Sequence, residues 1–203
     1  MNPPSALERA LRRASESRRE PEQRCDLCSV PIPQDHRHVL DLQAREVLCA
    51  CVACSLLFER EGAGLGRYRL VPSRRLRLEA DPLFGALDVP VGLAFFVKSS
   101  AEGRVVAHYP SPMGATRWDL DVGVWEALEA RHPEVREMAP DVEALLVNTA
   151  RGADERWLVP IDDCYRLVAL IRREWRGLSG GGTVWPEIER FFAELAGTSA
   201  STR

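Results

Sequence analysis

The chain has 203 residues, of which 45% are hydrophobic and 28% are charged, a composition typical of one ordinary globular domain with a small additional module. Its longest uninterrupted apolar stretch, residues 91–97, contains a glycine and is far shorter than the roughly 20 residues that cross a bilayer, so we expect no membrane span. The net charge of −3 argues against general nucleic-acid binding, because basic side chains that neutralise phosphates supply most of that affinity.

The charges are divided unevenly along the chain. Residues 1–78 carry 14 arginines against 10 acidic residues, whereas residues 79–203 carry 13 basic residues against 20 acidic ones. Only the N-terminal third is therefore basic enough to meet a nucleic acid. No apolar segment follows the first arginines, so we expect no secretory signal and a cytoplasmic protein. In that reducing compartment, paired cysteines favour metal binding over disulfide formation.

Residues 1–23 are polar and rich in arginine, glutamate and serine. The segment Ser5–Glu8 fits a capping box, and Leu7, Leu11 and Ala14 fall on one helical face. The pattern predicts a short helix or a disordered arm, with a partner-docking helix as the alternative.

Residues 24–72 are predicted to form a metal-binding ribbon. Cys25 and Cys28 make one Cys-x-x-Cys pair, and Cys51 and Cys54 make a second pair after 22 intervening residues. Two cysteines three positions apart in a tight turn can both bind one ion, and a hairpin can bring a second such turn to complete a tetrahedron. The spacing therefore predicts a single site with four thiolate ligands.

Four thiolates leave no open coordination position, so we expect structural rather than catalytic zinc. Iron in a rubredoxin-like centre is the first alternative, followed by a redox dithiol or an iron–sulfur cluster. Zinc is favoured because rubredoxin turns usually carry glycine after the second cysteine, where Ser29 and Ser55 stand here. Cys49 is a reserve ligand that could replace Cys51, and His36 and His38 could be alternative ligands.

The rest of this module has the pattern of a hairpin and a further strand. Residues 39–42 and 46–48 are expected to be the two arms of the hairpin, and residues 67–71 alternate as a third strand. The apolar segment 56–58 could cover the metal or anchor the ribbon to the next domain.

Residues 73–88 are predicted to be a basic connector. Together with the preceding strand they carry five arginines and no nearby acid: Arg67, Arg69, Arg74, Arg75 and Arg77. The cluster is interpreted either as a solvated face or as a docking surface for an acidic protein or a nucleic-acid backbone.

Residues 89–196 are predicted to form a separate α+β domain, and residues 197–203 a disordered tail. Strands are expected at residues 91–97, 104–109, 142–147 and 156–161, and helices near 120–132, from 162 to about 176, and from 183 onward. Hairpins joined by helices favour an antiparallel or mixed sheet with helices on one face. Asp162 is the expected N-cap of the second helix.

No set of catalytic residues can be assembled from the sequence. Cys164 lies beside Asp162 and Asp163 near a helix start, and a buried structural thiol explains it better than a reactive one. His108 and His132 are isolated and are expected at the surface or at an edge. We therefore predict that the protein is not an enzyme.

With these motifs in place, the chain resembles a bacterial family of uncharacterised proteins, chiefly actinobacterial, encoded in nickel–iron hydrogenase gene clusters. The segments that carry the resemblance are Arg24–Cys28, Asp35–His38, Leu48–Cys54, Gly66–Pro72, Val89–Phe96 and Val159–Val168. The resemblance brings no established activity. It implies a role in the assembly, maturation or electron supply of a hydrogenase, with a hydrogenase subunit or a maturation factor as the protein partner.

Three functions remain open on the sequence. The first is a non-enzymatic zinc-binding accessory protein that docks onto a protein partner. The second is a rubredoxin-like electron carrier, and the third is a zinc-ribbon nucleic-acid-binding protein that uses the arginine cluster.

Overall fold

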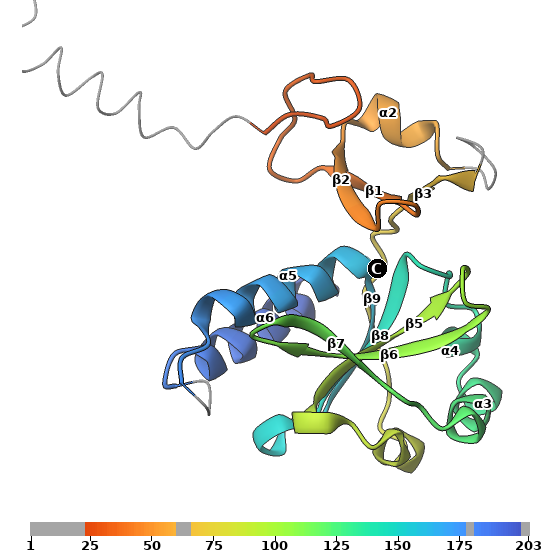
Figure 1. Ribbon diagram of the computed structural model, residues 1–203, viewed down its shortest axis with the longest axis vertical. Helices are drawn as coiled ribbons and strands as arrows, with labels where there is room; N and C mark the ends of the chain where they lie inside the picture. The colour runs from red at the N-terminus through yellow and green to blue at the C-terminus, as the bar shows by residue number, and fades with distance from the viewer. Residues whose placement is uncertain (1–22, 60–65, 178–180, 200–203) are drawn as a thin grey trace, which may run out of the picture. The chain divides into compact units, whose positions relative to one another are not determined.

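The computed structural model describes residues 23–59, 66–177 and 181–199 (Figure 1). The chain divides into two compact units, Met1–Tyr68 and Arg69–Arg203, which we call the metal module and the sheet domain. The helix or arm expected for residues 1–23 lies almost wholly outside the described residues. Of the expected tail, the first three residues continue the last helix, which ends at Ser199.

The metal module is built on an antiparallel hairpin. Strand β1 (Arg37–Asp41) pairs with β2 (Glu46–Ala50), so that Arg37 lies opposite Ala50 and Asp41 opposite Glu46. The short helix α2 (Val52–Leu56) follows β2 directly. Strand β3 (Tyr68–Leu70) adds to the free edge of β1, which gives the sheet order β2-β1-β3. The hairpin and the third strand that the sequence predicts are both present.

The sheet domain contains one six-stranded sheet in which every paired neighbour is antiparallel, in the order β4-β9-β8-β5-β6-β7. The strands are β4 (Leu76–Arg77), β5 (Leu93–Ser99), β6 (Arg104–Ser111), β7 (Gly114–Trp118), β8 (Glu143–Asn148) and β9 (Glu155–Pro160). The predicted α+β class is confirmed. Residues 73–88, described above as a connector, supply β4 to this sheet and the 3₁₀ helix η2 (Pro82–Leu87) to its face.

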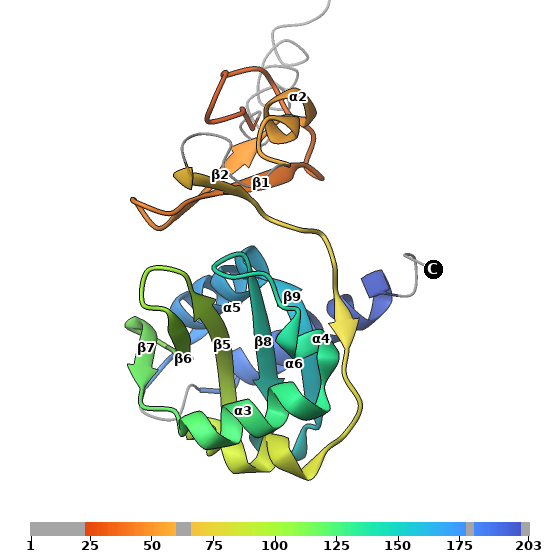
Figure 2. The ribbon, with the colours of Figure 1, turned by 90° about the vertical axis from the view of Figure 1, so that its right-hand side faces the viewer.

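Helices cover both faces of the sheet, whereas the sequence predicted them on one face only (Figure 2). Helices α3 (Val122–Arg131) and α4 (Pro133–Arg136) lie with η2 on one side. Helices α5 (Ile161–Glu174) and α6 (Val184–Ser199) cover the other. The central strand β8 explains the difference, because all six of its residues are buried, and a strand that is buried on both faces needs a layer on each.

The two layers are visible in the alternation of side chains along the strands. Phe96 and Leu145 pack with Trp125 and Leu128 of α3 in one buried cluster. The alternate residues, such as Phe95, project to the opposite face, because successive side chains of a strand point to opposite sides of a sheet.

Candidate metal centre

The first cysteine pair lies in a tight turn before the hairpin. The Ser29 N–H donates to the carbonyl of Cys25 at 2.7 Å, and the Cys25 N–H donates to the carbonyl of Val30 at 2.9 Å. Ser29 has a φ of 62°, the left-handed conformation that favours glycine. The turn therefore has the backbone shape expected of a metal-binding knuckle, with a serine at its strained position.

The second pair is presented by the start of helix α2. Cys51 is the N-cap, and its sulfur accepts a hydrogen bond from the N–H of Cys54 at 3.4 Å. The two pairs are joined by a reciprocal contact. The Asp26 N–H donates to the carbonyl of Cys49 at 2.9 Å, and the Cys49 N–H donates to the Asp26 carboxylate at 2.6 Å. These two bonds hold the end of β2 against the first turn.

The four predicted sulfurs converge. The Sγ atoms of Cys25, Cys28, Cys51 and Cys54 all lie within 4.8 Å of one another, and those of Cys28 and Cys51 are 3.7 Å apart. A tetrahedral zinc site with Zn–S bonds of about 2.3 Å has S···S edges of roughly 3.8 Å. The spacing of the sulfurs therefore matches that of a four-thiolate site, and these cysteines could hold one metal ion.

The pKa values of Cys25 and Cys54 are shifted in opposite directions within this group of thiols. Burial raises the pKa of Cys25, but the backbone N–H groups of Cys51, Leu27 and Cys28 outweigh it and lower that pKa to about 6. The pKa of Cys54 is raised to about 12, first by its hydrogen bonds with Cys28 and Cys51. Four sulfurs this close cannot all be thiolates unless a cation compensates their charge, so the donor set suits a bound metal.

Cys49 lies outside this quartet. Its sulfur groups instead with the ring nitrogens of His36 and His38, and these three ligand atoms also lie within 4.8 Å of one another. The residues considered above as a reserve and as alternative ligands thus form a cluster of their own. The sequence did not predict it, because the grouping depends on the pairing of β1 with β2.

The five arginines of the predicted docking surface are all engaged by acids. Arg67 donates to Asp41 through Nε at 3.0 Å and also through its terminal nitrogen, and Asp41 further accepts from the backbone of Gln43 and Ala44. The hydrogen bond from Arg67, with the coulombic attraction and the two backbone donors, lowers the pKa of Asp41 to about 2 despite its burial.

The other four arginines pair within the sheet domain. Arg69 contacts Asp141 at 2.8 Å and Arg77 contacts Glu155 at 3.3 Å. Arg74 and Arg75 each donate two bonds to a buried carboxylate. The respective partners are Glu143, at 3.0 Å for both bonds, and Asp163, at 2.6 and 3.2 Å. The sequence neighbourhood of these arginines indicates an acid-free basic surface, and the structure shows that this is wrong. Their acidic partners come from strands and helices that are distant in the sequence.

The acidic start of α5 has a structural role. Asp163 is buried and accepts a hydrogen bond from Arg75. Cys164 is fully buried, and this burial, followed by the charges of Asp163 and Asp162, raises the pKa of the Cys164 thiol well above its ordinary value. Pro160, and not Asp162, is the N-cap residue of the helix. Asp162 lies in the first turn and accepts a hydrogen bond from the Asp163 N–H at 3.0 Å. A raised pKa disfavours the thiolate that a reactive cysteine needs.

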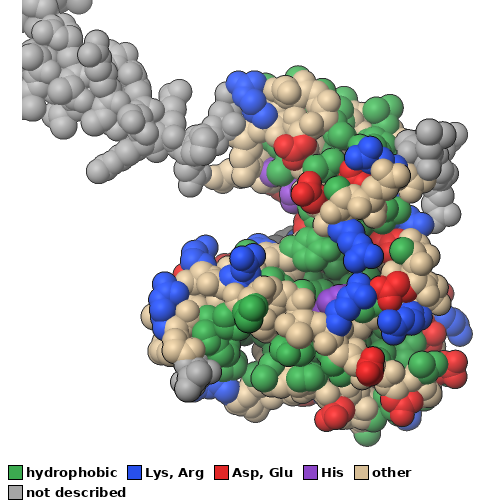
Figure 3. All heavy atoms as spheres, in the orientation of Figure 1, with side chains coloured by type: hydrophobic (Ala, Val, Ile, Leu, Met, Phe, Trp, Pro, Cys, Tyr) green, Lys and Arg blue, Asp and Glu red, His purple; other side chains and the backbone are tan. Residues whose placement is uncertain are grey.

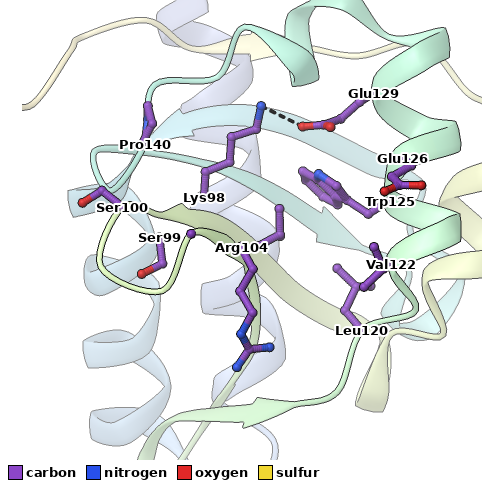
Figure 4. A pocket seen from close by; sticks show the side chains of 12 residues that line it. Lys98, Ser99, Ser100, Arg104, Leu120, Val122, Trp125, Glu126, Glu129 and Pro140 are labelled. Carbon is purple, nitrogen blue, oxygen red and sulfur yellow. Dashed lines mark ion pairs between the residues drawn. The ribbon is translucent and has the colours of Figure 1, made fainter.

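The sheet domain also contains a cavity of about 490 Å³ beside α3 (Figure 4). Its wall includes Leu120, Val122 and Trp125, and the buried indole N–H of Trp125 has no hydrogen-bond acceptor among the described residues. At the rim, Lys98 is paired with Glu129 at 2.7 Å, and Arg104 is paired with an acid outside the cavity lining. Both cations are thus neutralised, and the lining does not select a class of ligand.

A family model described as a family of unknown function, DUF5947, matches residues 24–199. No curated protein and no solved structure matches the chain. Among the helices that the structure describes, none has the length and apolar character that a membrane crossing requires. Because the family match covers most of the chain, the protein belongs to DUF5947, a family of unknown function.

Proposed function

We propose that the protein is a non-enzymatic zinc-binding accessory protein that docks onto a protein partner during nickel–iron hydrogenase assembly or maturation in the cytoplasm. The observation that carries the proposal is that two of the four converging cysteines, Cys51 and Cys54, lie at the start of a helix with exposed apolar side chains. The hydrogenase context is supported by the sequence resemblance alone. Four thiolate ligands fill the coordination sphere of a tetrahedral ion, so the role of the ion is structural. The function then lies on the surface that the ion holds in place.

That surface is helix α2 with the residue after it. Its exposed apolar residues are Val52, Leu56 and Leu57, which are 71%, 56% and 65% exposed. Figure 3 shows hydrophobic side chains on the surface around this helix. Cys51 caps α2 and Cys54 lies in its first turn, so metal binding fixes the orientation of the helix. Exposed apolar groups held on a rigid element are typical of protein–protein contact sites.

A double substitution tests this surface. We expect Leu56→Glu with Leu57→Glu to weaken partner binding by more than tenfold, because two charges would have to be desolvated in an apolar contact. The readout is complementation of a gene-deletion strain, measured as hydrogenase activity and processing of its large subunit. Met113→Glu is the matched control, since Met113 is 94% exposed in the sheet domain. It should complement fully.

Three results would refute the proposal. Normal, fully processed hydrogenase in the deletion strain would remove the assigned context. Full complementation by the double variant would remove the assigned surface. Catalysis by the purified protein, abolished by a change at Cys164 or Asp163, would contradict the non-enzymatic role.

An electron carrier with iron in the four-cysteine site is the second candidate function. The donor set suits either ion, so the metal content of protein from native cells separates the two. Stoichiometric zinc and a colourless protein are expected. The nucleic-acid-binding alternative has lost its main support, because the arginines on which it relied are paired with acids.

A further inference from the structure

We propose that His36, His38 and Cys49 form a second metal site, distinct from the four-cysteine site, which binds a late first-row transition ion such as Zn²⁺, Ni²⁺ or Cu²⁺ and leaves one coordination position open. Their three ligand atoms lie within 4.8 Å of one another, and none of the three residues belongs to the cysteine quartet.

The register of the hairpin creates this cluster. His38 lies directly opposite Cys49 in the pairing of β1 with β2, and directly opposed side chains project from the same face of a sheet. His36 is two residues before His38, so the period of an extended chain directs it to the same side. The two imidazole rings meet edge to face with their centroids 4.7 Å apart. A shift of the register by one residue would separate Cys49 from both histidines.

The tautomer of His36 is set for metal binding. Its Nδ1 lies 2.9 Å from the carbonyl of Pro33 and 3.0 Å from that of Gln34, and since carbonyls only accept, Nδ1 must carry the proton. Nε2 then holds a lone pair. That atom is buried and has no hydrogen-bond partner among the described residues.

An unpartnered buried acceptor is costly, and a metal ion would satisfy it. Metal-binding histidines typically donate their other ring N–H to a backbone carbonyl or a carboxylate, which fixes the orientation of the ring. His36 has this arrangement already. The backbone of Cys49 is likewise fixed by the hydrogen bond of its N–H to Asp26.

The donor set defines the class of ion. Two imidazoles and one thiolate suit zinc, nickel and copper, whereas Mg²⁺ and Ca²⁺ require oxygen ligands. Three protein ligands leave room for a water or an external ligand, unlike four thiolates. All three residues are only partly buried.

Titration of the full-length apoprotein with Co²⁺, followed by absorption spectroscopy, tests the inference. The wild type should bind two equivalents with different spectra, because sulfur-to-cobalt charge transfer is stronger with four thiolates than with one. His36→Ala with His38→Ala, and separately Cys49→Ser, should each retain the four-thiolate spectrum and lose the other equivalent. The retained signal shows that the module is folded. His132→Gln, a histidine of the sheet domain, is the control and should bind both.

Each remaining outcome overturns the proposal. A wild type that binds one equivalent in excess Co²⁺ has no second site. A double histidine variant that still binds two equivalents places the second ion elsewhere. Loss of both equivalents from the histidine variant would mean that the imidazoles serve only the fold of the four-cysteine site.

Discussion

Cys28→Ser is expected to release the ion from the four-cysteine site and to unfold the metal module, while the sheet domain stays folded. Cys28 is exposed, so the substitution itself introduces no steric conflict. Structural zinc contributes on the order of 10–16 kcal/mol to small modules, whose apolar cores are too small to fold alone. In the described part of this module, the buried aliphatic side chains are few, and Val39, Leu40 and Ala50 lie on the hairpin.

The chain provides its own reporter for this experiment. All five tryptophans lie in the sheet domain: Trp118, Trp125, Trp157, Trp175 and Trp185. The thermal transition followed by tryptophan fluorescence should therefore be unchanged in Cys28→Ser and in wild type treated with chelator. Metal content should fall to the level of the second site or to zero, and limited proteolysis should cut before residue 69. A shifted fluorescence transition would show that the sheet domain depends on the metal.

Cys49→Ser is the matched control for the ligand assignment. It makes the same chemical change five residues before Cys54 but outside the quartet. It should retain the four-thiolate ion and its protection from proteolysis. Loss of that ion in Cys49→Ser, with retention in Cys51→Ser, would exchange these two residues in the assignment.

The second large effect is expected at the paired arginines. Arg74→Ala and Arg75→Ala should each destabilise the sheet domain, because the first leaves the buried Glu143 without its charged partner and the second leaves the buried Asp163 with only the more distant Arg166, at 3.4 Å. The side chains of Glu143 and Asp163 are 5% and 4% exposed. Breaking a buried pair from one side costs about 3–5 kcal/mol, and because both arginines are partly solvated we expect the lower end of that range.

Arg77→Ala is the matched control, because its partner Glu155 is 26% exposed and an exposed pair contributes only about 0–1 kcal/mol. Urea unfolding followed by tryptophan fluorescence measures all three variants. Arg74→Met combined with Glu143→Gln should lose less stability than the two single changes added together, since no uncompensated charge remains. Equal effects of Arg74→Ala and Arg77→Ala would contradict this account. Arg74 and Arg75 are therefore expected to serve the stability of the sheet domain rather than the binding of a partner.

The sequence predicts local features of the protein well and long-range pairings poorly. The cysteine quartet could be predicted, because each pair lies within one turn and the hairpin between them has a clear pattern. The partners of Arg74 and Arg75 lie 69 and 88 residues away, a distance over which no periodicity applies. The cluster of His36, His38 and Cys49 required the register of a hairpin, which its turn determines.

The elements predicted from the sequence omit strand β7 for a different reason. The sequence predicts that the strand of residues 104–109 ends before Pro110, because proline cannot donate to a sheet. The pairing of β6 with β5 ends at His108, so Pro110 pairs only with β7, opposite Ala115. Its missing N–H therefore costs no bond to β5. A proline is compatible with a strand where one of its two neighbours has already ended.

The cavity beside α3 has a consequence for covalent chemistry. Lys98 is the only lysine of the chain, since the other 26 basic residues are arginines, and no other side chain carries an amine. Its ammonium group donates to the carbonyl of Arg136 at 2.6 Å and pairs with Glu129 (Figure 4). A reagent or an acetyl-transferring enzyme that is specific for side-chain amines therefore finds a single target. Acylation there would remove the charge, break the pair with Glu129 and change the rim of the cavity in one step.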